Sequence, residues 1–325
     1  MTHSTSNSFV FSRHGRSTRW LDTTRRTAGA AIATTVLTAT LSATPATAQS
    51  VFDDMPNWLA DRGRLLATAG VLQIEGASGA GLTPWAVITG YGTRDSVGAN
   101  VHHTFAATSD FTLNSSGIAV GLFNRVELSY ARQWFDTGAA GARLGLGDGY
   151  DFSQDVFGAK VRISGNLVYD QDTWMPQLAA GVQYKNAEQE DVLAAIGAEA
   201  DNGVDYYIAA TKLFLEHGLL LNLMARATQA NQFGLLGFGG PEQDGYQLEL
   251  ESSVAYLLSR TIVLGTDYRT KPDQLAFAPE EDAVAIYGAW LPNKTFSVTA
   301  GYLALGDVAL QGEQNGIYLS IAAGF

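Results

Sequence analysis

The sequence predicts an all-β fold, a transmembrane, antiparallel up-and-down β-barrel of about fourteen strands, with twelve strands as the alternative. Three observations lead to this prediction. Residues 316–325 alternate like a strand that crosses a bilayer, the connections between the predicted strands alternate in length, and charged residues gather on one face of those strands.

The carboxyl-terminal stretch, residues 316–325, gives the clearest strand pattern. Every second residue from Phe325 back to Ile317 is apolar, which is the period of a β-strand. A tilted strand needs about 9–11 residues to cross the hydrocarbon core. A strand that stops on an aromatic residue resembles the closing strand of bacterial outer-membrane barrels, so Phe325 is predicted to be the sorting signal read by the barrel-assembly machinery. A secreted β-sandwich that ends in Phe is the alternative.

The composition agrees with one large β-architecture. The chain has 325 residues, 35 of them Gly, and only 16% of its residues are charged. After the N-terminal region no run reaches the roughly 18 apolar residues of a membrane helix, but alternating strands span a membrane without one. The absence of Cys excludes disulfides. The net charge of −12 argues against nucleic acid as a partner, because phosphate binding needs basic surface.

Residues 1–48 are predicted to be an export signal that is removed. The basic region contains Arg25 and Arg26, residues 28–43 are apolar, and Ala46-Thr47-Ala48 provides a small-residue cleavage site. Residues 49–64 lack a clear period and are predicted to be a periplasmic lead-in. Residues 65–325 are predicted to form the barrel, located in the bacterial outer membrane.

The predicted strands are joined by connections that alternate between long and short over the last ten, including a short one at Tyr169–Trp174 and a long one at Gly306–Asn315. This asymmetry is typical of outer-membrane barrels and has no reason to occur in a Greek-key sandwich. The first four segments fit less well, so twelve strands with an inserted N-terminal hairpin remain an alternative. The predicted strands are Leu65–Glu75, Pro84–Gly92, Asn100–Ala107, Phe111–Leu122, Val126–Asp136, Val156–Val168, Met175–Lys185, Val204–Phe214, Leu219–Thr228, Gln247–Leu258, Ile262–Arg269, Asp282–Trp290, Thr295–Leu305 and Gly316–Phe325.

Alternation within the strands separates an apolar face from a polar one. In Gln247–Leu258, Leu248 and Leu250 lie on one face, and Glu249 and Glu251 lie on the other. A basic side chain facing lipid at the bilayer midplane costs roughly 2–4 kcal/mol. The charged face is therefore predicted to line the lumen, and the apolar face to contact outer-membrane lipid and lipopolysaccharide.

Charged residues are thus expected inside the barrel. The phase of the two faces places Glu251 opposite Arg269 as a cross-strand pair. Lys160, Arg162 and Lys185 form an inward basic group, which belongs either to a salt-bridged interior or to a stripe that guides anions through a pore. The predicted lumen-lining residues are Lys160, Arg162, Lys185, Arg226, Glu249, Glu251, Asp267 and Arg269.

The long connection Gln229–Tyr246 is too apolar for an ordinary solvated loop. Two placements are consistent with this composition. The loop folds into the barrel mouth as a constriction, or it packs against the outer rims of neighbouring strands. The predicted constriction residues are Phe233, Leu235, Leu236 and Phe238.

Signatures of enzymes are poor, and the chain is not expected to be an enzyme. After residue 48 the only histidines are His102, His103 and His217, and no nucleophile elbow, zinc-protease motif or nucleotide-binding fingerprint occurs. The Gly145–Asp151 stretch does not have the spacing of an EF-hand. No catalytic residue, metal site or cofactor is predicted.

Several stretches spread over nearly the whole mature chain carry a resemblance to a known family. They are Ile74-Glu75-Gly76-Ala77, Pro84-Trp85-Ala86, residues 126–133, residues 181–185, residues 230–240, residues 268–272 and Leu291-Pro292-Asn293-Lys294. Together they resemble the proteobacterial family of domain of unknown function 3034, whose members are thought to be outer-membrane proteins. The resemblance implies the localisation, and it implies no catalytic residue or substrate.

Three classes of function are consistent with the sequence. The expected one is a passive channel or small-molecule transporter of the outer membrane. The alternative is a non-conducting structural or surface-interaction barrel with acidic outer loops, such as residues 188–191. The third is an outer-membrane hydrolase. The expected partners are membrane lipid, lipopolysaccharide and, during biogenesis, the barrel-assembly machinery, while the oligomeric state stays open.

Overall fold

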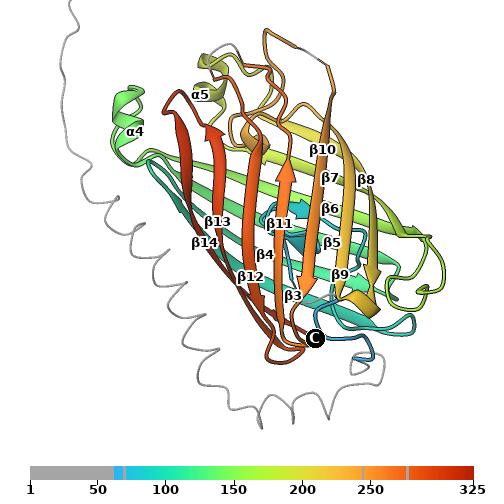
Figure 1. Ribbon diagram of the computed structural model, residues 1–325. Coiled ribbons are helices and arrows are strands. Elements are labelled where there is room, and N and C mark those ends of the chain that lie inside the picture. The colour runs from blue at the N-terminus through green and yellow to red at the C-terminus, as the bar shows by residue number, and fades with distance from the viewer. Residues whose placement is uncertain (1–61, 69–70, 244, 276–277) are drawn as a thin grey trace, which may run out of the picture. The chain divides into compact units, whose positions relative to one another are not determined.

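The computed structural model describes residues 62–68, 71–243, 245–275 and 278–325. Strands β3 to β14 form a closed antiparallel barrel in which each strand pairs with the next along the chain and β14 pairs with β3 (Figure 1). The predicted up-and-down barrel is confirmed. Its strands are β3 Val97–Thr108, β4 Thr112–Leu122, β5 Val126–Asp136, β6 Asp151–Ser164, β7 Gln177–Ala187, β8 Asn202–Phe214, β9 Leu219–Thr228, β10 Gln247–Leu257, β11 Ile262–Arg269, β12 Ala283–Trp290, β13 Phe296–Asp307 and β14 Glu313–Gly324.

The barrel has twelve strands, so the alternative was right and the count of fourteen was wrong. The first two predicted segments, Leu65–Glu75 and Pro84–Gly92, are not wall strands. Between them a small hairpin forms from β1 (Gly79–Ala80) and β2 (Thr83–Pro84). Almost every residue from 71 to 91 is buried, with no alternation between an inner and an outer face. Residues 71–91 lie inside the barrel, where protein surrounds them on all sides (Figure 1). Each wall strand, by contrast, is apolar on the one face that turns outward.

The two ends of the barrel differ. One end, here called the loop end, carries α4 (Gly138–Arg143) and α5 (Glu190–Ala195); the other, the turn end, carries the C-terminus (Figure 1).

Two predicted connections need correction. The connection predicted at Tyr169–Trp174 runs from 165 to 176, because Gly165, with φ +76°, ends β6 early. The connection predicted at Gly306–Asn315 shortens to 308–312, because β13 continues past an irregularity to Asp307.

The outer face of the wall is apolar, as predicted. Leu221 and Leu223 of β9 are exposed, whereas Asn222 and Arg226 of the same strand are buried inside. Lipid cannot solvate an isolated charge, and two charged residues on the outward side of β5 and β6, Arg132 and Asp155, pair with each other at 2.7 Å. None of the helices in the described part of the chain is long and apolar enough to cross a membrane. Exposed aromatic residues near strand ends include Tyr184, Tyr268 and Trp290, and the exposed Tyr169 and Trp174 lie in the connection between β6 and β7.

The predicted export signal, residues 1–48, and residues 49–61 of the predicted lead-in lie outside the described residues. The described end of the lead-in is tied to the turn end of the barrel. Arg62 donates to Thr295 Oγ1 at 3.1 Å, and Arg64 donates to the carbonyl oxygens of Ile88 and Gly90 at 2.5 and 2.9 Å. The chain therefore enters the barrel interior from the turn end.

The two-faced wall predicts how an outward charge affects stability. Leu223 lies outward on β9 and is 62% exposed, so Leu223→Arg should lower the free energy of unfolding in lipid vesicles by roughly 2–4 kcal/mol. Leu215→Arg, in the turn-end connection after β8, is the control and should cost at most about 1 kcal/mol. Denaturant titration followed by tryptophan fluorescence measures both. Equal losses for the two variants would contradict a lipid-covered wall.

Candidate functional site

Residues 71–91, here called the plug, lie inside the barrel and are held by side chains of the wall. The Glu127 carboxylate accepts hydrogen bonds from the backbone N–H groups of Ser78 at 3.0 Å and Thr89 at 2.7 Å. The Asp267 carboxylate accepts one from Leu82 at 2.9 Å. A buried backbone group without a partner is costly, so inward polar side chains replace the water that the plug excludes. Further wall residues that hydrogen-bond the plug backbone are Ser115, Gln133, Lys160, Gln177, Thr211 and Asn222.

A buried network of ion pairs joins the plug to β7–β11. Glu75 of the plug lies 2.5 Å from Lys185, 3.3 Å from Arg226 and 3.4 Å from Arg269. Arg226 also contacts Asp205 at 3.0 Å and Glu251 at 2.7 Å. Buried charges of this kind persist only when each is paired and hydrogen-bonded. The network therefore fixes the plug in one position across the lumen.

The predicted pair between Glu251 and Arg269 is confirmed, since the two residues are register partners on β10 and β11 and their charged groups lie 3.5 Å apart. Glu249 joins the same network, 3.1 Å from Arg269. Asp267 lies inside as expected, where its carboxylate accepts a hydrogen bond from Leu82 N of the plug.

The predicted basic group of Lys160, Arg162 and Lys185 does not form a continuous stripe. Lys160 pairs with Glu127 at 3.0 Å and donates to plug carbonyl groups, and Lys185 pairs with Glu75. Arg162 is half-buried near the turn end of β6, and its Nη1 has no hydrogen-bond partner among the described residues. The geometry favours the salt-bridged interior over a path for anions.

Three residues of the site were missed by the sequence analysis, namely Glu75, Glu127 and Asp205. All three are buried and pair with predicted lumen residues. The signal that could have found them is charge balance, because the eight predicted residues contain more bases than acids and a buried base needs a carboxylate. Glu75 was hidden in a segment assigned to the wall.

The connection Gln229–Tyr246, here called the mouth loop, lies in the barrel mouth. The carbonyl oxygen of Phe233 accepts hydrogen bonds from Lys185 at 3.1 Å and Gln154 at 3.2 Å. The Phe233 ring centroid lies 4.4 Å from Cζ of Arg269, a cation–π contact. The loop turns back sharply at η2 (Gln232–Gly234), where Gln232 and Phe233 have positive φ. The remaining predicted constriction residues, Leu235, Leu236 and Phe238, are buried.

A neighbouring loop holds this connection in place. The Glu280 carboxylate accepts a hydrogen bond from Gln232 N at 2.7 Å, and Lys271 Nζ lies 3.9 Å from Glu280. Burial raises the pKa of Glu280 to about 8, against the opposing effect of Lys271. Lys271 also donates to the Leu305 carbonyl group at 2.9 Å. The mouth loop is thus attached both to the plug network and to β13.

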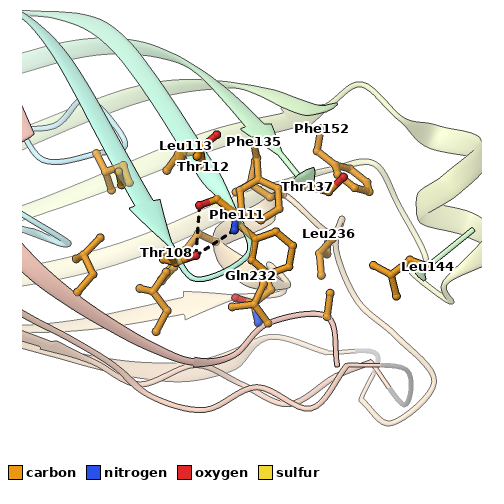
Figure 2. Close-up of a pocket in the computed structure, with 18 of the residues that line it drawn as sticks. Thr108, Phe111, Thr112, Leu113, Phe135, Thr137, Leu144, Phe152, Gln232 and Leu236 are labelled. Atoms are coloured by element: carbon orange, nitrogen blue, oxygen red, sulfur yellow. Dashed lines mark hydrogen bonds between the residues drawn. The ribbon is translucent and has the colours of Figure 1, made fainter. Parts of the chain in front are cut away.

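An apolar cavity of about 130 Å³ lies at the loop end between the mouth loop, the plug and the wall. Figure 2 shows Phe111, Phe135 and Leu236 pointing into one space beside the turn between β3 and β4, where Thr108 and Phe111 hydrogen-bond each other. The polar groups among its lining residues are few. Further lining residues are Ile74, Leu82, Leu144, Phe152, Val192, Ile196, Phe233, Leu303, Leu305 and Val308.

Phe325 follows β14 at the turn end. Its backbone exchanges hydrogen bonds with Ala99 of β3 at 2.9 and 3.0 Å, and its carbonyl group accepts one from Tyr91 N at 3.3 Å. The terminal residue thus helps to close the barrel and to hold the last residue of the plug. Its role as an assembly signal stays a prediction.

The model of a family described as "Protein of unknown function (DUF3034)" matches residues 68–322. The chain belongs to the DUF3034 family. The matched region of this DUF3034 chain contains the whole plug and nearly all of the barrel wall, so the two belong to one family unit. No curated protein matches the chain.

Among solved structures, the KdgM porin is 9% identical with a TM-score of 0.46, over 70% of this chain and 99% of that chain. The COG4313 outer membrane channel from Pseudomonas putida F1 is 13% identical with a TM-score of 0.43, over 75% and 97%. Outer membrane phospholipase A from Escherichia coli is 8% identical with a TM-score of 0.40, over 69% and 92%. At these values the likenesses carry no argument about substrate or activity.

The ion network predicts a large penalty for removing its central base. Arg226→Met leaves four buried carboxylates, Glu75, Asp205, Glu249 and Glu251, with one partner fewer. The free energy of unfolding should fall by about 3–5 kcal/mol, as for other broken buried pairs.

The matched control is Arg132→Met in β5, which removes two ion pairs that are partly open to solvent, with Asp155 and Glu188. It should cost about 1 kcal/mol or less. Denaturant titrations of both variants in lipid vesicles measure the two free energies of unfolding. Comparable losses of stability in the two variants would show that the interior pairs do not anchor the plug.

Proposed function

We propose that this chain is an outer-membrane transporter that binds small apolar molecules at its loop end. The apolar cavity beneath the mouth loop is the observation that carries the proposal. It is concave, lined by Phe and Leu side chains, and bounded by both the plug and the connecting loops, as ligand sites commonly are. The loop end then faces the outside and the turn end faces the periplasm.

The size of the cavity suits a small ligand. An engineered cavity of about 150 Å³ lined by Leu, Ile and Phe stays dry and binds benzene. The cavity of this chain, at about 130 Å³, has a similar lining. We therefore assign it molecules of about the size of one six-membered carbon ring.

A transporter is favoured over an open passive channel because the plug occupies the lumen. Lys160 and Lys185, which would be needed to guide anions, are fully engaged with carboxylates and plug carbonyl groups. Hydrated ions need a continuous wet path, and the buried plug interrupts it. The proposal assigns no catalytic step to the chain.

The outer-membrane location is supported by the closed barrel, its apolar outer face and the predicted export signal. A barrel that engages partners at its surface is the second candidate, favoured by one observation. The first turn of α5 carries the acidic residues Glu190 and Asp191, both exposed at the loop end. Its test is a surface phenotype that is lost on deletion of this loop while the barrel stays intact.

Binding in the cavity can be measured with a single thiol, because the chain has no Cys. Val308→Cys places the thiol in the cavity lining, and Gly245→Cys places it on an exposed loop. With methylcyclohexane at about ten times its dissociation constant, N-ethylmaleimide should label the cavity thiol about tenfold more slowly, because the site is occupied. The loop thiol should react at an unchanged rate. Equal slowing of the labelling at both thiols, or no slowing at the cavity thiol, would contradict the proposed binding site.

The plug predicts the electrical behaviour of the barrel. The intact chain should give no steady ion conductance in planar bilayers, because the plug fills the lumen. Replacement of residues 71–91 by a Gly/Ser linker should produce stepwise conductance, since a flexible linker forms no fixed barrier. The control replaces residues 144–149 of the loop after α4 in the same way and should stay closed. Steady conductance through the intact chain would contradict a closed lumen.

A further inference from the structure

Four phenylalanine side chains from four separate segments line the apolar cavity. Phe111 lies in the turn between β3 and β4, Phe135 and Phe152 belong to β5 and β6, and Phe233 belongs to the mouth loop. The ring centroids of Phe111 and Phe135 lie 5.0 Å apart with their planes inclined by 31°, and Figure 2 shows both rings at the cavity. Among the described residues that line the cavity, none is Tyr or Trp. The aromatic part of the lining is therefore purely hydrocarbon.

Most of the polar side chains in the lining already have hydrogen-bond partners. Thr137 Oγ1 donates to the Tyr150 carbonyl oxygen at 2.7 Å, and Thr108 Oγ1 donates to Gln314 Oε1 at 2.9 Å. The Gln232 side chain makes two hydrogen bonds, at 3.2 and 3.3 Å, to residues outside the lining. The one further polar side chain is a threonine at the start of β4, and no charged side chain occurs among the described lining residues. The cavity thus offers few free partners to a polar ligand.

The phenylalanine rings are positioned before a ligand binds. The Phe233 carbonyl oxygen accepts a hydrogen bond from Lys185 at 3.1 Å, and Cζ of Arg269 lies 4.4 Å from the Phe233 ring centroid. The Phe111 backbone accepts a hydrogen bond from Thr108 N at 2.9 Å and donates one to Thr108 Oγ1 at 3.3 Å. The other two rings stand on paired wall strands. Because these groups are ordered in advance, little entropy is lost when they contact a ligand.

Phenylalanine rings distinguish an aromatic ligand from a saturated one of similar size. Both kinds of ligand gain free energy in proportion to the apolar area that they bury. Only the aromatic ligand also has a π system, which pairs with neighbouring rings in offset or edge-to-face arrangements at centroid distances of about 4.5–7 Å. Four rings around a space of about 130 Å³ leave a bound ring within reach of such pairs.

We propose that the cavity selects aromatic hydrocarbons, so that the ligand class is a single aromatic ring without a polar group. Phe111, Phe135, Phe152 and Phe233 recognise the ring, and the scarcity of free polar groups excludes phenols. This inference rests on the proposed function, because it names the ligand class of the same cavity.

The selection is tested with toluene and methylcyclohexane, which have the same carbon skeleton. Both should slow the labelling of Val308→Cys by N-ethylmaleimide. After correction for the partition of each ligand between water and hexadecane, toluene should give half-protection at a concentration about fivefold lower, as expected for one aromatic pair. Equal corrected concentrations would overturn the aromatic selection and keep the proposed function. Protection by neither ligand would overturn both.

The role of the rings is tested with Phe135→Leu and Phe152→Leu, each combined with Val308→Cys. Each change should reduce the preference for toluene over methylcyclohexane at least twofold, because it removes one aromatic pair. Both ligands are measured on the same variant, so a general loosening of the loops cancels in their ratio. Leu236→Met changes an aliphatic residue of the lining at nearly constant volume and should leave the ratio unchanged. An unchanged ratio in both Phe variants, or an equal fall in the control, overturns recognition by the rings.

The exclusion of polar rings is tested with phenol, which has nearly the shape of toluene and carries one hydroxyl group. Half-protection of Val308→Cys should need a phenol concentration at least tenfold higher than that of toluene, because the hydroxyl group would be buried without a partner. Protection by phenol at the concentration of toluene would overturn the assignment to hydrocarbons.

Discussion

The structure depends on one constraint, which is that a segment of irregular backbone inside a membrane barrel must find all its hydrogen-bond partners in the wall. The plug meets this constraint through residues that the wall directs inward. Glu127 is the clearest case, because its two carboxylate oxygens each accept one plug N–H group. The polar inner face of the barrel is therefore complementary to the backbone of the plug.

The buried ion pairs also fix the position of the plug in the lumen. Glu75 is the plug's only charged residue described within the ion network, and it contacts three bases on β7, β9 and β11. Such buried pairs add little net stability compared with apolar packing, but they penalise every displacement that separates them. The plug is held firmly on this side and less firmly against β12–β14, where small and aromatic side chains face it.

The sequence predicted the wall well and the interior poorly. The alternation in Gln247–Leu257 and Leu219–Thr228 identified both faces and the partner of Glu251, because strand periodicity is local. The first two predicted strands were wrong because apolar character alone does not distinguish a segment facing lipid from one surrounded by protein. The partners of Glu75 were beyond reach for a different reason, since Lys185, Arg226 and Arg269 stand on three strands that surround the plug only in the closed barrel.

The order of the plug and the wall along the chain has a consequence for biogenesis. The plug precedes β3, and the sheet closes when β14 pairs with β3. No end of the chain then has to be threaded into a finished cylinder, since the strands can wrap around a segment that is already present. Closure at the seam beside Ala99 and Phe325 would trap the plug in the same event that completes the sheet.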